Sequence, residues 1–211
     1  MVDQNILEFL KKRNDRDNYP ELLNEEIINN PDTVNDVMIG LLSDSTRTRS
    51  SYAEIASIIS EEHPGKLYPH ADIFVECLNS SIPEVRCFAA SILGNLASVD
   101  QAGIITDQIK LIARDLSNDR ESIQASTVQT LSKIAHANPE EAERIFNLLI
   151  SHKKYFPKER IRVLLQNLEH FSDNKELRED ARRFLEYYAD NGSKPVQNKA
   201  LEVLRKFSIS G

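Results

Sequence analysis

Apolar residues recur at intervals of three and four along most of the chain, and short polar segments separate these stretches. One stretch contains Ile105, Ile109, Ile112 and Leu116, and similar spacing returns within residues 142–149 and 177–188. Such intervals place side chains on one face of an α-helix, whereas the side chains of a strand alternate between its two faces. Runs of alternating β-branched residues are missing from the sequence. The pattern therefore predicts an all-α protein built from short amphipathic helices.

Residues typical of helix starts stand between the amphipathic stretches. Ser81 and Glu84 have the spacing of a capping box, in which a hydroxyl and a carboxylate accept hydrogen bonds from free backbone N–H groups. Asn138 precedes a proline and two glutamates, and Asp173 stands three residues before Glu176. Asn or Asp before the first turn, and Pro within it, are typical of helix N-termini. We expect helices to begin at these three places.

A pattern of about 37 residues occurs five times. Equivalent points fall at positions 48, 85, 123, 161 and 196, with steps of 37, 38, 38 and 35 residues. A short polar turn precedes most of these points, and another amphipathic helix precedes each turn. A helix pair this short cannot enclose a core, so each pair buries its faces against the pairs before and after it, as in a solenoid. We expect one domain over residues 1–211, with five repeats over 32–208 and two capping helices within 1–31.

The segment from Ser80 to Ala97 resembles the turn and second helix of a HEAT repeat. It begins with Pro-x-Val-Arg at Pro83 and ends with Leu-Gly-x-Leu-Ala from Leu93, and the resemblance extends over about residues 32–208. The family pattern often has Asp in the turn, a place that Asp44, Asp119 and Asp190 can fill in other copies. The resemblance implies a right-handed α–α superhelix of HEAT-like, armadillo type, with about five helix pairs and an N-terminal helical cap. Proteins of this kind work mostly as scaffolds, adaptors and regulatory subunits, and their second helices line a concave face.

Composition bears on where the protein acts. Two cysteines in 211 residues fit a reducing compartment and exclude a disulfide-dense scaffold. No apolar run approaches the ~18 residues of a membrane span, and the N-terminus lacks the basic and apolar regions of a signal peptide. We expect a cytoplasmic protein without a membrane partner.

Charge is unevenly distributed along the chain. The formal net charge of −7 combines −9 over residues 1–105 with +2 over 106–211, and residues 144–211 hold 14 bases and 9 acids. The total argues against a general polyanion binder. The bases near the C-terminus either contact nucleic acid or an acidic protein, or form solvated helix faces with the acids between them. Four nearby aromatic residues can supply stacking surfaces, namely Tyr155, Phe156, Tyr187 and Tyr188.

The residues that most often carry catalysis or bind metals have no supporting pattern. His63, His136 and His170 fall near the ends of second helices, where a protonated imidazole opposes the negative end of the helix dipole. Cys77 and Cys87 stand ten residues apart without a C-x-x-C pair, so we expect small, buried or half-buried hydrophobic side chains instead of zinc ligands. The phosphate-binding pattern G-x-x-x-x-G-K-[ST] and the nucleophile pattern G-x-S-x-G are absent. We expect no enzymatic activity, no metal and no cofactor.

Long polar side chains occupy one equivalent position in all five repeats. These residues are Arg49, Arg86, Gln124, Arg162 and Gln197. They can form a row of ligand-binding groups, or they can hydrogen-bond turn carboxylates and carbonyls between stacked repeats. We favour the structural role, because side chains of similar hydrogen-bonding reach recur there.

The remaining polar positions of the second helices define the expected binding surface on the concave side. They are Glu54, Ser57, Ser91, Asn95, Gln129, Ser132, His136, Asn167, His170, Glu202 and Arg205. This surface lacks the aromatic anchors that dominate many interfaces, so it suits a broad polar contact.

Two functions follow from these observations. The first is a non-catalytic scaffold or adaptor that binds a protein partner on the concave surface. The alternative is a nucleic-acid-binding protein similar to the HEAT-like DNA glycosylases, which would bind DNA in a salt-sensitive manner through the basic C-terminal third.

Overall fold

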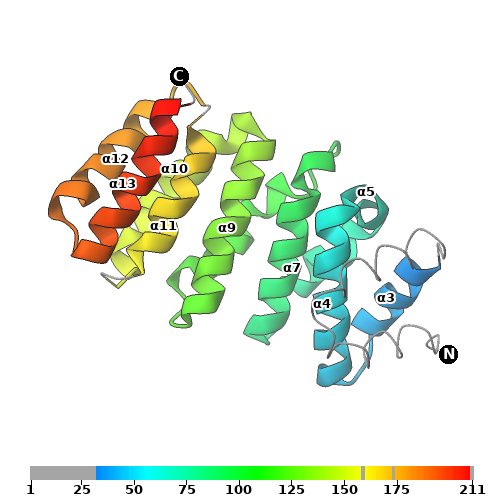
Figure 1. Ribbon diagram of the computed structural model, residues 1–211. Helices are drawn as coiled ribbons and strands as arrows, with labels where there is room; N and C mark the ends of the chain where they lie inside the picture. Colours follow the sequence, from blue (N-terminus) through cyan, green and yellow to red (C-terminus); the bar gives the residue numbers. More distant parts are fainter. Residues whose placement is uncertain (1–31, 158–159, 173, 210–211) are drawn as a thin grey trace. The chain divides into compact units, whose positions relative to one another are not determined.

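The computed structural model describes residues 32–157, 160–172 and 174–209, with side chains to position 207, and every regular element within these ranges is a helix (Figure 1). The expected capping helices within residues 1–31 lie outside the described residues. Within the described ranges, no helix combines the length and the apolar character needed to cross a bilayer. The all-α prediction is confirmed.

Contacts divide the chain into two compact units that meet at Ala102 and Gly103. Gly103 has a φ of 73°, in the left-handed region where a side chain would be strained, so glycine suits this junction. The single domain over residues 1–211 stays a prediction.

From residue 32 onward, two helix pairs form the first unit. Its elements are α3 (Thr33–Leu41), α4 (Thr46–Glu62), α5 (Pro64–Leu67), η2 (Tyr68–His70), α6 (Ala71–Cys77), α7 (Pro83–Leu96) and η3 (Ala97–Val99). The second helices α4 and α7 pack side by side, with α3 against α4 and α6 against α7. Tyr52, Ile55 and Ile59 of α4 are completely or almost completely buried between these neighbours. Burying one such side chain stabilises the fold by about 1.5–3 kcal/mol.

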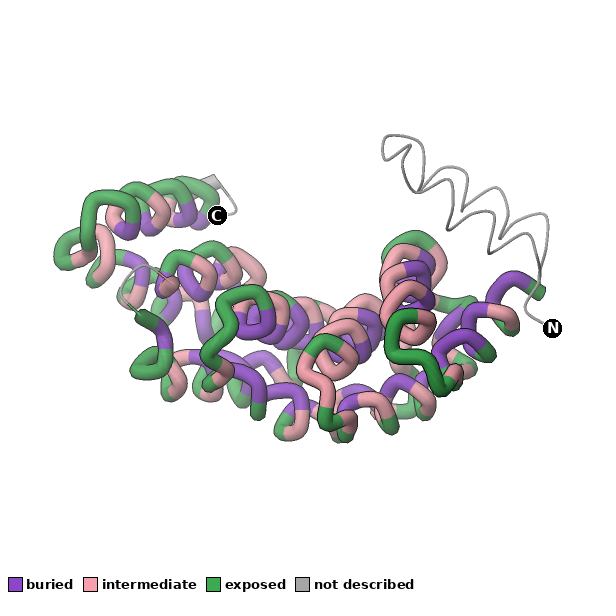
Figure 2. The backbone as a smooth tube through the Cα atoms, turned by 90° about the horizontal axis from the view of Figure 1, so that it is seen from below, coloured by how far each residue is buried: buried purple, intermediate pink, exposed green. Residues whose placement is uncertain are grey.

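Three helix pairs form the second unit. Its elements are η4 (Thr106–Gln108), α8 (Ile109–Ala113), η5 (Arg114–Ser117), α9 (Glu121–Ala137), η6 (Pro139–Glu141), α10 (Ala142–Ser151), η7 (His152–Tyr155), α11 (Ile161–Asn167), η8 (Leu168–Phe171), α12 (Arg178–Asn191) and α13 (Lys194–Ile209). The second helix α11 packs between α9 and α13, and α12 packs against α13. Buried and exposed stretches alternate along the helices, as amphipathic periodicity requires (Figure 2).

Five second helices in the described part of the chain begin close to the equivalent points predicted from the sequence. The second helices begin at Thr46, Pro83, Glu121, Ile161 and Lys194, at or two residues before the equivalent points of the repeat. The described residues therefore contain two helix pairs in the first unit and three in the second.

Helices begin at two of the expected places, α7 at Pro83 and η6 at Pro139, but their capping hydrogen bonds differ from those expected. Pro83 is the first residue of α7, so Ile82 occupies the N-cap position and Ser81 forms no capping box; the Ser80 hydroxyl accepts instead from the Ile82 N–H at 3.1 Å. Asn138 donates from Nδ2 to the Ile134 carbonyl at 3.1 Å, so its side chain seals the end of α9 and caps no following helix.

Asp173, the third expected cap, lies outside the described residues. The neighbouring Asn174 accepts at Oδ1 from the Glu176 and Leu177 N–H groups, both at 3.1 Å. A side-chain cap therefore exists one residue beyond the predicted position, just before α12.

Replacing Gly40 by alanine tests the close approach of α3 to α4. A Cβ at position 40 would lie 2.3 Å from ring carbons of the fully buried Tyr52. We expect Gly40→Ala to lower the free energy of unfolding by about 1–3 kcal/mol in urea denaturation, although alanine favours helices. Gly65→Ala is the matched control, because a Cβ there has nothing within 4 Å. An equal effect of both substitutions would contradict this account.

Candidate functional site

The second helices of each unit present the polar side chains that the sequence assigned to a binding surface. Each unit has its own such surface, formed by α4 and α7 in the first unit and by α9, α11 and α13 in the second, and we call each of them a second-helix surface. Glu54, Ser57, Ser91 and Asn95 are all half-buried on α4 and α7. Side chains in this state have groups within reach of a partner and are also held by their neighbours.

A hydrogen bond joins the two second helices of the first unit. Asn95 Nδ2 of α7 donates to Ser60 Oγ of α4 at 2.7 Å, and Ser60 Oγ donates to the Ser57 carbonyl at 2.6 Å. Ser60 is completely buried, so this chain fixes the spacing of α4 and α7 beneath the surface. The sequence analysis missed Ser60 because its partner lies 35 positions away, in another repeat.

The second unit places six of its seven expected surface residues where a partner can reach them. Gln129, His136, Glu202 and Arg205 are exposed, and Asn167 and His170 are half-buried. Asn167 Nδ2 donates to the Val163 carbonyl at 2.9 Å, which fixes the orientation of its amide.

Ser132 was wrongly placed on this surface. Its side chain is completely buried, and its Oγ has no hydrogen-bond partner within the described part of the chain. The helical spacing alone put Ser132 beside Gln129, but α9 has neighbours on several sides, which enlarges its buried face. The second unit therefore contributes six residues to the surface and not seven, and all six are exposed or half-buried.

Two histidines from adjacent repeats meet on the second unit. The ring centroids of His136 in α9 and His170 in η8 lie 5.8 Å apart. Burial lowers the pKa of His170, and the nearby His136, Lys133 and Lys206 lower it further, whereas Glu169 acts in the opposite direction. His170 therefore favours its neutral form in the folded protein, which opposes the dipole-stabilised cation expected from its place near a helix end.

The long polar side chains at the equivalent repeat positions bind the turns. Arg49 Nη1 donates to the Ser43 carbonyl at 2.5 Å, and Arg86 Nη1 donates to the Ser80 carbonyl at 3.0 Å. Both bonds run six positions back, to the turn between the two helices of the same repeat. These two hydrogen bonds therefore stabilise the turn within each repeat. The expected bonds were between stacked repeats, whereas these lie within one repeat.

Glutamine takes the same role in two other repeats. Gln124 Nε2 donates to the Leu116 carbonyl at 2.7 Å and to the Tyr155 carbonyl at 3.3 Å, and so also reaches the next helix pair. Gln197 Nε2 donates to the Asp190 carbonyl at 3.4 Å. We call Arg49, Arg86, Gln124 and Gln197 the turn clamps. Arg162, at the remaining equivalent position, is exposed on α11.

Many bases of the C-terminal third pair with acids. The pairs with N–O distances of 2.7–3.8 Å are Arg144–Glu141, Arg160–Glu121, Arg182–Glu186, Arg183–Glu179, Arg183–Asp180 and Lys199–Glu202, and Lys206 also pairs with Glu169. A hydrogen bond from Lys199 lowers the pKa of Glu202, and one to Glu169 raises the pKa of Lys206. This interleaving favours solvated helix faces over a continuous basic stripe for nucleic acid.

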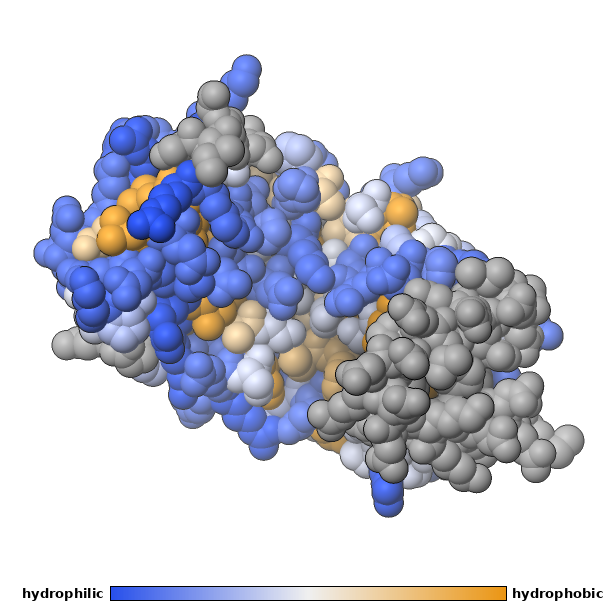
Figure 3. All heavy atoms as spheres, viewed as in Figure 1, coloured by the Kyte–Doolittle hydropathy of each residue, from blue (hydrophilic) through white to orange (hydrophobic). Residues whose placement is uncertain are grey.

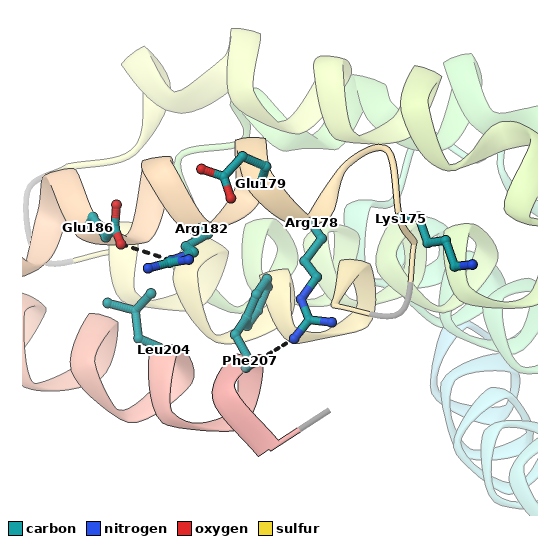
Figure 4. A pocket seen from close by; sticks show the side chains of 7 residues that line it. All are labelled: Lys175, Arg178, Glu179, Arg182, Glu186, Leu204 and Phe207. Atoms are coloured by element: carbon teal, nitrogen blue, oxygen red, sulfur yellow. Dashed lines mark hydrogen bonds and ion pairs between the residues drawn. The ribbon is translucent and has the colours of Figure 1, made fainter. Parts of the chain in front are cut away.

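A hollow of about 490 Å³ lies on the side of α12 that carries Arg178, Arg182 and Glu186 (Figure 4). Arg178 Nη2 donates to the Phe207 carbonyl at 2.5 Å, and Arg182 pairs with Glu186 at 3.0 Å. Both arginines are therefore engaged within the α12–α13 pair, and Arg178 supports the C-terminal end of α13. This hollow lies between the two helices of the terminal pair, and none of the predicted surface residues lines it.

Metal-binding and nucleophilic chemistry have little support in the described residues. Nowhere in those ranges do three or more His, Cys, Asp or Glu side chains form a group that could hold a metal ion. Cys77 and Cys87 are half-buried free thiols, and burial raises the pKa of Cys77, which lowers its reactivity at neutral pH.

Several solved structures are similar to this chain. A designed armadillo repeat protein in complex with the peptide (KR)4 has a TM-score of 0.69 at 18% identity, over 89% of this chain and 86% of that one. A second designed armadillo repeat protein has a TM-score of 0.64 at 17% identity over the same shares. A computationally designed armadillo repeat protein for modular peptide recognition has a TM-score of 0.60 at 18% identity, over 82% of both chains.

Comparison with sequences gives no match. Neither a protein-family model nor a curated protein matches this chain. At 17–18% identity the structural likeness concerns the fold, and it shows that the chain has an armadillo/HEAT-like helical-repeat fold.

Replacing Gln124 tests the turn clamps. Gln124 is 2% exposed, and Gln124→Leu removes the donor shared by the Leu116 and Tyr155 carbonyls. We expect the free energy of unfolding to fall by about 1–3 kcal/mol, because buried polar groups lose a partner. The control is Gln129→Leu on the exposed side of α9, with an expected change within about 0.5 kcal/mol. Equal urea midpoints for the two variants would refute the clamp.

The pKa of His170 predicts a pH dependence of stability. Because this pKa is lower in the folded chain than its ordinary value of 6.5, the unfolded chain binds more protons as the pH falls through that value. We expect the melting temperature to fall between about pH 7.5 and pH 5.5, and to fall less in His170→Gln. The control is His70→Gln in the first unit, which should keep the full dependence. An unchanged pH dependence in His170→Gln would rule out this assignment.

Proposed function

We propose that this protein is a non-catalytic scaffold or adaptor that binds an extended segment of a protein partner along its second-helix surface. The observation that carries the proposal is the arrangement of polar side chains over neighbouring second helices. In the first unit, α4 and α7 lie side by side and carry hydrogen-bonding groups at Glu54, Ser57, Ser91 and Asn95. In the second unit, α9, α11 and α13 carry a separate surface of the same kind over three helices.

The designed armadillo repeat proteins with this fold support a peptide as the ligand. One was solved with the peptide (KR)4, and another was designed for modular peptide recognition. A polypeptide in extended form carries backbone donors and acceptors along its whole length, which rows of Ser, Asn, Gln and Glu side chains can match. Hydrophilic side chains also dominate the face in Figure 3, where hydrophobic residues show in separate patches. This composition suits a broad polar contact.

The same distribution supports a binding role without catalysis. Glu54, Asn95, His136 and Asn167 stand on four different helices, and none of them lines the hollow beside α12. Catalysis requires a nucleophile or acid–base pair and charge-stabilising donors to converge on one reacting atom. Side chains spread along a surface instead distribute their contacts over a long ligand.

The charge of the first unit indicates a basic partner segment. Residues 32–102 contain ten acidic and four basic side chains, a formal net charge of −6. Glu54 and Glu61 stand seven residues apart on α4, which places them on the same side of the helix. Complementary charge accelerates association and selects among partners.

Binding of a labelled (KR)4 peptide to the full chain tests the proposal. We expect saturable binding by fluorescence anisotropy, with affinity that falls as salt is raised, because charged contacts are screened. Glu54→Gln should weaken binding about three- to tenfold, which corresponds to roughly 0.6–1.4 kcal/mol.

Glu76→Gln is the matched control for this experiment. Glu76 is exposed on the first helix α6, so the variant has the same net charge change away from the second-helix surface. Equal weakening in both variants would indicate general charge attraction, and absence of saturable binding would contradict the basic-peptide proposal.

A further inference from the structure

Two aromatic side chains of the second unit are exposed on the first helices of their pairs. Tyr187 of α12 is 59% exposed and Tyr155 of η7 is 47% exposed, which is unusual for large aromatic residues with apolar rings. Both belong to the first helices of their pairs or to the direct continuation of these helices. The polar contacts of the second-helix surface do not use them.

Tyr187 stands between two hollows. The first, of about 360 Å³, is formed by Phe146 and Ile150 of α10 together with Phe184 and Tyr187 of α12. The second, of about 420 Å³, is lined by Tyr187 and seven others, namely Phe156, Ile161, Tyr188, Asn191, Gly192, Ser193 and Val196. We call these two hollows and their shared wall at Tyr187 the aromatic groove. Their volumes lie at the lower end of the range of sites that hold small apolar groups.

The rings of the groove are fixed by one another. Tyr188 packs edge-on against Tyr187 with centroids 5.1 Å apart and an interplanar angle of 88°, and against Phe184 with centroids 5.0 Å apart. Leu185 between them in sequence is completely buried and anchors this part of α12. A rigid aromatic wall loses little conformational freedom when a partner binds, which favours affinity.

Lys153 and Lys154 contact aromatic rings near the groove, so their positive charges can pair with the acids of a ligand. Lys153 Nζ lies 5.7 Å from the centroid of the Phe184 ring, and Lys154 Nζ lies 5.0 Å from that of Tyr155. Within the described part of the chain, the contacts of these lysines are with rings and not with carboxylates. Arg183, by contrast, is shared between Glu179 at 3.5 Å and Asp180 at 3.8 Å. Lys153, which lines the first hollow, therefore provides positive charge there, and Lys154 follows it directly in η7.

We infer that the aromatic groove binds an acidic peptide segment that carries bulky apolar side chains. An aromatic or aliphatic side chain would enter the hollow between α10 and α12, and neighbouring carboxylates would pair with Lys153 and Lys154. Buried aromatic anchors surrounded by charged residues are the usual source of binding energy in protein interfaces. Complementary charge would orient the segment so that its acids face the lysines.

The groove fits a peptide better than a nucleic acid. Base stacking uses the flat exposed face of an aromatic ring, whereas these hollows are concave and take an inserted side chain. Arg183, which lines the first hollow, and the adjacent Arg182 are already paired with acids.

The experiment uses the full chain and a labelled short peptide of Glu and Asp residues around a central pair of Phe residues. We expect saturable binding by fluorescence anisotropy, and a loss of about tenfold or more when both Phe residues of the peptide are replaced by Ala. Tyr187→Ala should weaken binding to a similar extent. The double variant Lys153→Glu with Lys154→Glu should weaken it further, because it reverses the charge beside the hollow.

Matched controls separate the groove from general charge and from unfolding. Lys110→Glu with Lys175→Glu has the same net charge change on exposed positions outside the groove, and it should bind the acidic peptide like the unaltered chain. Glu54→Gln, on the second-helix surface, should also leave this binding unchanged. Thermal melting by circular dichroism establishes that each variant is folded.

Three results would overturn the inference. The first is equal binding by the Lys153 and Lys154 double variant and by the unaltered chain. The second is equal binding of the peptide with and without its Phe residues. The third is saturable binding of a single-stranded oligonucleotide that requires Tyr187 and both lysines while the acidic peptide does not bind. Because the (KR)4 experiment concerns other residues, the two proposals succeed or fail separately.

Discussion

The structure depends on the requirement that each second helix bury apolar side chains against more than one neighbour. In the first unit, α4 contacts its own first helix α3 and the next second helix α7, and its apolar residues are enclosed only by both together. The remaining face of such a helix is narrow and polar. This narrow face forms the second-helix surface, so the surface arises directly from the way the repeats pack.

Sequence periodicity was sufficient to predict the fold because it reports this packing directly. Apolar spacing located the five second helices to within two residues, and the HEAT-like segment from Pro83 indicated how they stack. The long polar side chains at equivalent positions were also identified, although most of their hydrogen bonds lie within one repeat. When one type of residue recurs at the equivalent position of each repeat, its structural role can be predicted from a single sequence.

Contacts between residues far apart in the chain could not be predicted in the same way. Ser132 fits the polar pattern of α9, and only the neighbouring helices make it buried. The hollow between α10 and α12 needs side chains from two repeats, so local spacing identified Tyr187 as an aromatic residue without indicating a groove. Helix caps failed for a related reason, since Asn138 hydrogen-bonds backward to α9.

The buried amide of Gln124 makes the third repeat different from the others. Arginine serves at the equivalent positions of the first two repeats, where the guanidinium is only half-buried, but a full charge at the 2%-exposed site of Gln124 would carry a desolvation cost. Gln124 also donates a hydrogen bond to the Tyr155 carbonyl of the following helix pair, so its position depends on which pair comes next. The repeats are therefore not interchangeable modules. Their order is fixed by contacts of this kind. Shuffling or deleting a repeat here would separate the buried Gln124 donor from the Tyr155 carbonyl that accepts from it.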